Sequence, residues 1–120
     1  MGFFDRFRQT NPFRDPAELD KLSLNHLEKL GADLSLPRHV IHFVYFDAED
    51  DALRARDEIP RAGWETTVVA PSESTSQWLV RAEATRVVDT RTITSYRAWF
   101  EQMAASCNGE YDGWEAAAKP

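Results

Sequence analysis

The sequence predicts an α+β domain with a four-stranded antiparallel sheet, two helices on one face of the sheet and an extra N-terminal helix. Two observations lead to this fold class. Short runs of β-branched and aromatic residues alternate with stretches in which apolar residues recur every three or four positions. After the first helix these runs follow the order strand, helix, strand, strand, helix, strand. The 120 residues suit one domain, large enough to fold without a metal ion or a disulfide.

The first helix is predicted from its start signal and its apolar stripe. Asp15 is placed to cap it, Pro16 suits the first helical position, and Glu18 follows three residues after the cap. Gly31 is placed to end it. The stripe that we expect to face the domain consists of Leu19, Leu22, His26 with Leu27, and Leu30.

The chain divides into three predicted parts. Residues 1–14 form an N-terminal arm, residues 15–37 form the first helix and a connector, and residues 38–117 form the main domain. Phenylalanines and arginines interleave in the arm, a pattern typical of a tail that packs back on its domain. The alternative is an amphipathic arm that binds a partner or a membrane surface.

The first strand of the main domain is predicted near residues 39–46. Both of its alternating faces are largely apolar, which is typical of a strand at the centre of a sheet. His42 shares one face with Val40 and Val44, whereas His39 points to the other. The two histidines therefore cannot bind one metal ion together.

A helix and a hairpin follow. An acidic segment, residues 47–51, starts the helix, and Pro60 is expected to end or bend it near Glu58. Strands are predicted at residues 64–71 and 77–85, joined as an antiparallel hairpin by a serine-rich loop. In the second of these strands Trp78 shares a face with Val80.

The last helix and the last strand complete the domain. The helix carries an apolar stripe that ends in Cys107, with Thr92 or a neighbouring threonine as its cap. We expect Cys107 to be buried and unreactive. The last strand, near residues 110–116, contains Gly113, and a glycine inside a strand marks a bulge or a close backbone approach. Right-handed crossovers would give this order of elements the ferredoxin-like βαββαβ arrangement, with both helices on one face.

Composition and charge exclude several classes of function. The formal net charge is −6, which argues against direct binding of nucleic acid because phosphate contacts need a basic surface. One cysteine rules out an internal disulfide and fits a reducing compartment, so we expect a cytoplasmic location. No segment approaches the roughly 20 apolar residues that span a bilayer, and the N-terminus lacks a signal-peptide core, so we expect no membrane partner.

We find no catalytic arrangement in the sequence. The five glycines are scattered, the histidines do not have metal-ligand spacing, and we therefore expect no catalytic residue, no bound metal and no cofactor. Asp112 is the one acid in an unusual setting, between Tyr111 and Gly113 and close to Trp114. It either contacts a basic group of a partner or accepts hydrogen bonds from backbone donors in a turn or bulge.

The segment Tyr111-Asp112-Gly113-Trp114 resembles the signature of the RraB-like family, the regulators of ribonuclease E activity B. Further stretches resemble the family in the same order and extend the resemblance over roughly residues 28–116: Leu30 to Leu34, Pro37 with Arg38, His42 to Phe46, Ala62 to Glu65, and Trp78 to Val80. The resemblance implies a ferredoxin-like domain without catalytic activity that binds and inhibits ribonuclease E and so changes RNA lifetimes. This chain lacks the long acidic tail of that inhibitor.

Two functional hypotheses follow. The first is a protein-binding regulator of ribonuclease E or of another basic protein, which uses the open sheet face and the Tyr111-to-Trp114 segment. Its contact residues would be His42, Tyr45, Trp78, Tyr111, Asp112, Gly113 and Trp114. The second is a small-molecule-binding or catalytic domain with a pocket near His42, Asp112 and Trp114. A homodimer with apposed sheet faces is compatible with either hypothesis.

Overall fold

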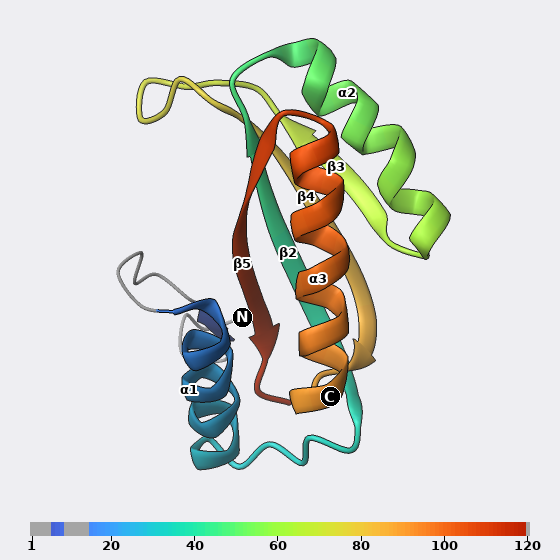
Figure 1. Cartoon of the computed structure of the whole chain (residues 1–120). Helices are drawn as coiled ribbons and strands as arrows, with labels where there is room; N and C mark the ends of the chain where they lie inside the picture. Colours follow the sequence, from blue (N-terminus) through green and yellow to red (C-terminus); the bar gives the residue numbers. More distant parts are fainter. Residues whose placement is uncertain (1–5, 9–14, 120) are drawn as a thin grey trace.

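An antiparallel sheet forms the centre of the molecule in the computed structural model, which describes residues 6–8 and 15–119 (Figure 1). Its strands lie in the order β1-β5-β2-β4-β3, and each neighbouring pair is antiparallel. The strands are β1 (Arg6–Arg8), β2 (Pro37–Phe46), β3 (Glu65–Val69), β4 (Trp78–Val87) and β5 (Gly109–Ala117). The helices are α1 (Pro16–Lys29), α2 (Glu49–Glu58) and α3 (Thr90–Ser106), with a short 3-10 helix at Ile59–Ala62.

All four predicted strands are present, and β2 lies between β5 and β4 as its two apolar faces predict. The sheet differs from the prediction by one strand. Arg6–Arg8, assigned to the N-terminal arm, pairs with the end of β5 and makes the sheet five-stranded. A three-residue strand has too few positions to show an alternating pattern, so the sequence gives no signal for it.

Helices α2 and α3 cover the same face of the sheet (Figure 1). The core lies between them and the sheet, where Val44, Phe46 and Val80 pack with Ala52 and Phe100, all fully buried. α2 ends at Glu58 and continues as the 3-10 helix, the bend that Pro60 predicts. This face holds the large side chains of the core.

The N-terminal cap of α3 differs from the prediction. Asp89, and not a threonine, is the cap residue, and its carboxylate accepts a hydrogen bond from the backbone N–H of Thr92 at 2.9 Å. The Thr92 hydroxyl accepts in return from the Asp89 backbone N–H at 3.0 Å. Thr92 is thus the N3 residue of a capping box, three positions after the cap, and so still marks the start of the helix.

The buried face of α1 also differs from the predicted stripe. Leu22 and Leu30 are each 44% exposed, whereas Asp20, Ser23, Leu24 and Leu27 are buried. α1 packs against α3 and β1 through this face. The buried face of α1 includes a charged residue, Asp20. A prediction that uses only the apolar residues therefore places the buried face too far round the helix.

Among residues 6–8 and 15–119, no helix is long and apolar enough to cross a membrane. The same ranges contain no cluster of three or more histidine, cysteine, aspartate or glutamate residues able to hold a metal ion.

Candidate functional site: the bulged strand β5 and its polar network

A β-bulge interrupts the pairing of β5 with β2 at the predicted glycine. Phe43 of β2 lies opposite Gly113 and the next residue, Val44, lies opposite Tyr111, so Asp112 is an extra residue in β5. Gly113 has φ +102°, a backbone conformation that side chains with a Cβ rarely adopt. The glycine predicted to mark a bulge therefore does so.

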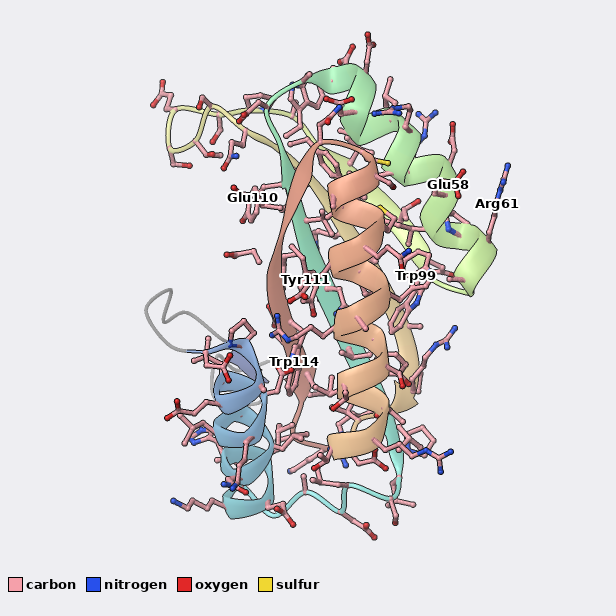
Figure 2. All side chains as sticks on the ribbon, in the orientation of Figure 1. Glu58, Arg61, Trp99, Glu110, Tyr111 and Trp114 are labelled. Carbon is pink, nitrogen blue, oxygen red and sulfur yellow. The ribbon has the colours of Figure 1, made fainter. Side chains whose placement is uncertain are left out.

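The bulge changes which side chains of β5 face the helices. Residues three apart in a regular strand point to opposite faces. Tyr111 and Trp114, however, lie opposite Val44 and His42, which share the helix-covered face of β2. Both aromatic rings therefore point from β5 towards the helix layer, as Figure 2 shows. The extra residue lets one short motif contribute two large rings to the same core.

A buried carboxylate joins this strand to two helices. Asp20 of α1 accepts hydrogen bonds from Nε and Nη2 of Arg97, both at 2.7 Å, in a two-pronged ion pair. The same carboxylate accepts a bond from Nε1 of Trp114 at 2.9 Å. The Asp20 side chain is 9% exposed and that of Arg97 13% exposed. One acid thus fixes α1, α3 and β5 to one another in a place where an unpaired charge would be costly.

The guanidinium of Arg97 also contacts Glu101 and Tyr111. Its Nη1 donates to Glu101 at 3.1 Å, and its Cζ lies 5.1 Å from the ring centroid of Tyr111. The second contact is a cation–π interaction that extends the polar network to the bulged motif.

The second half of the network surrounds His42, which is fully buried. Its Nδ1 is 2.6 Å from the hydroxyl of Tyr111, and its ring stacks on Phe100 with centroids 4.3 Å apart. Trp64 meets the imidazole edge-on at 4.8 Å. Within the described part of the chain, Nε2 of His42 has no hydrogen-bond partner.

Burial decides the protonation states of this pair. It lowers the pKa of His42 well below its ordinary value of 6.5, helped by the positive charges of Arg97 and Arg86. Burial also raises the pKa of Tyr111 well above 10, although Arg97 opposes the shift. The imidazole and the phenol are both neutral near pH 7. The hydrogen bond between the fully buried His42 and the half-buried Tyr111 joins β2 to β5.

The comparison with protein families gives a match over most of the chain. The model of the family described as regulator of ribonuclease activity B, RraB, matches residues 17–116, from the first turn of α1 to the end of β5. The chain belongs to the RraB family. The match includes every residue of the network described above. The comparison with curated proteins gives no match.

The predicted contact residues of this RraB-family chain fall into two groups. His42, Tyr111 and Trp114 meet in the buried network, and Trp114 and His42 have no exposed surface. Gly113 is buried beside them. The other three lie apart from this network: Tyr45 on the sheet face opposite α2 and α3, Trp78 half-buried opposite Phe46, and Asp112 exposed at the bulge.

Sequence reasoning missed Asp20 and Arg97, the ion pair on which the network depends. The two residues are 77 positions apart, and neither sits in a motif. The available signal was the spacing of Asp20 to Leu24 and Leu27, four and seven residues on, which places the acid on their face of α1.

The alternative prediction placed a ligand pocket near His42, Asp112 and Trp114. A surface cavity of about 390 Å³ lies nearby, between α1 and α3, lined by Leu24 and Ile93 and by the ion pair of Asp20 with Arg97. None of the three residues named in the alternative lines it. The cavity adjoins the polar network, but it is not the predicted pocket.

Proposed function

We propose that this RraB-family chain is a non-catalytic regulator that acts by direct contact with a ribonuclease. The family match over residues 17–116 is the observation that carries the proposal. The ribonuclease implied by the sequence resemblance is ribonuclease E, and the cytoplasm, where a lone buried thiol suits the reducing conditions, is the proposed place of action.

The buried chemistry supports a binding role over a catalytic one. The imidazole of His42 is enclosed by aromatic rings, and the carboxylate of Asp20 is already held by three hydrogen bonds. Polar groups satisfied by one another in a core stabilise one arrangement of strands and helices. In this proposal these groups hold β5 and the exposed side chains around its bulge in a fixed arrangement.

The proposed contact surface consists of the accessible groups around the bulge. It includes the exposed Asp112, the exposed Glu110 beside it, and Tyr45, which lies opposite Glu110 on β2. An aromatic ring flanked by acids suits a partner with basic side chains. His42, Tyr111, Gly113 and Trp114 would act indirectly, by holding this surface in place.

The test combines binding and ribonuclease inhibition. We expect the full chain to bind ribonuclease E and slow its cleavage of an RNA substrate. Asp112→Asn keeps the shape of the side chain and removes its charge, so binding should weaken about fivefold at low salt, and added salt should narrow the difference. Thermal stability should change little, because Asp112 is exposed.

Asp57→Asn is the matched control, since it removes the same charge from an exposed position on α2. Its affinity should equal that of the wild type. Equal affinity of Asp112→Asn and wild type at low salt would remove Asp112 from the contact surface. A chain that neither binds nor inhibits ribonuclease E would refute the proposed function itself.

A further inference from the structure

The side of β5 that faces away from β2 is only partly covered. β1 pairs there with Glu115, Ala116 and Ala117. At positions 109–114, no strand among the described residues pairs with β5 on this side, away from β2. We call this stretch the open edge of β5; it is visible above α1 in Figure 1.

An open strand edge presents backbone groups that can pair with another chain. Alternate residues of a strand direct their N–H and C=O groups to one side, and an added strand satisfies them. Proteins use this mode to bind extended peptides, with the backbone providing affinity and alternate side chains providing specificity. The bulge at Asp112 twists the edge, which disfavours indiscriminate pairing.

Acidic side chains accompany this edge. Glu110 lies opposite Tyr45 and Glu115 opposite Ile41, so both acids belong to the sheet face that α2 and α3 leave uncovered. Asp112, between them, is exposed. Figure 2 shows Glu110 projecting from β5 away from α3. A strand added at 109–114 would pass the carboxylates of Glu110 and Asp112.

The chain itself supplies an example of what this side of β5 accepts. β1 is the sequence Arg6-Phe7-Arg8, an extended segment with arginines at alternate positions. It pairs antiparallel with β5, and Arg8 takes the position opposite Glu115. A basic strand therefore already occupies the end of β5 that borders the open edge.

We propose that the open edge of β5 binds an extended basic segment of the partner, which adds to the sheet as a strand in line with β1. The segment carries arginine or lysine at alternate positions, so that its cations face Glu110 and Asp112. This inference rests on the proposed function and specifies how the partner is recognised.

The experiment uses the full chain and a fluorescent octapeptide of alternating arginine and valine. A second octapeptide has the same side chains, but alternate backbone nitrogens on one edge are methylated, which removes the N–H donors and keeps the charge. Fluorescence anisotropy at low salt should show at least tenfold weaker binding of the methylated peptide. Equal binding of the two peptides would overturn strand addition, because charge alone would then explain the affinity.

Paired variants locate the site. Glu110→Gln should weaken binding of the unmodified peptide three- to tenfold, whereas Glu58→Gln, an equal charge change on α2, should leave it unchanged (Figure 2). Equal losses in the two variants would overturn the assignment to β5. If the chain inhibits ribonuclease E while methylated and unmodified peptides bind alike, this inference fails and the proposed function stands. If strand addition is seen without any effect on a ribonuclease, the proposed function fails.

Discussion

The carboxylate of Asp20 joins three elements, because Arg97 of α3 and Trp114 of β5 both donate hydrogen bonds to this side chain of α1. We predict that Asp20→Asn lowers the free energy of unfolding by about 3 kcal/mol. The amide keeps the size of the side chain but leaves the charge of Arg97 poorly compensated in a buried place. Denaturant unfolding monitored by tryptophan fluorescence measures the change.

Asp57→Asn is the control for this prediction. Asp57 also forms an ion pair, with Arg56 at 3.0 Å, but its side chain is 67% exposed. Ion pairs of this kind contribute about 0–1 kcal/mol, so the variant should unfold almost like the wild type. Similar small losses in both variants would show that the buried carboxylate does not hold the three elements together.

His42 gives the stability of the protein a predictable pH dependence. Its pKa in the fold lies well below 6.5, so the unfolded chain binds a proton at this residue in a pH range where the folded chain does not. The free energy of unfolding is therefore independent of the titration of His42 above about pH 6.5. Below that pH, proton binding to His42 in the unfolded chain lowers the free energy of unfolding, by at most about 1.4 kcal/mol per pH unit.

Chemical unfolding at intervals between pH 7 and pH 5 measures this slope. His42→Phe keeps an aromatic ring but removes the titrating group, so its stability should fall less steeply than that of the wild type. His39→Gln, at a partly exposed position that bonds to Glu83, should keep the steep slope. Parallel curves for wild type and His42→Phe would contradict the prediction.

The sequence predicts the orientation of the two histidines on β2 but not the burial of Asp20. The opposite orientation of His39 and His42 follows from the two-residue period of a strand and is confirmed. The burial of Asp20 could not be predicted in this way, because a carboxylate is tolerated in a core only when its partners are also there. Those partners, Arg97 and Trp114, are distant in the chain.

Gly113 sets the shape of the bulged strand. A β-branched side chain at its φ of +102° strains the backbone, so Gly113→Val should lower the free energy of unfolding by about 1–3 kcal/mol. Glu110→Val places the same side chain in the same strand, at an exposed position where φ is not positive. This control should change the free energy of unfolding by less than about 0.5 kcal/mol. Thermal unfolding followed by circular dichroism compares them. Equal transition temperatures would mean that the bulge does not require glycine.

The elements that the sequence predicts well are those whose signals are local. α2 ends at Glu58, just before Pro60, and β2 carries apolar residues on both faces because both faces are buried. β1 is different. It exists because β5 offers an edge to it, and three residues carry no pattern of their own.

The fold of the whole molecule shields the thiol of Cys107 from solvent. Cys107 is 4% exposed, at the end of α3 and within the core cluster, which confirms its predicted burial. We predict that a thiol reagent labels native protein at least a hundredfold more slowly than unfolded protein, because the sulfur is reached only by opening the core. Labelling followed by mass spectrometry measures both rates. Equal rates would show that the end of α3 opens without global unfolding.

The long reach of the hydrogen bond from Trp114 to Asp20 also has a consequence for the newly made chain. The two residues are 94 positions apart. At roughly 5–20 residues per second, a ribosome needs about 5–20 s to produce Trp114 after Asp20 has been added. Arg97, the ion-pair partner of the same acid on α3, follows Asp20 by 77 residues, so the contacts of Asp20 with α3 and β5 are complete only when Trp114 has been added. α1 therefore reaches its final place only after α3 and the greater part of β5 have been made.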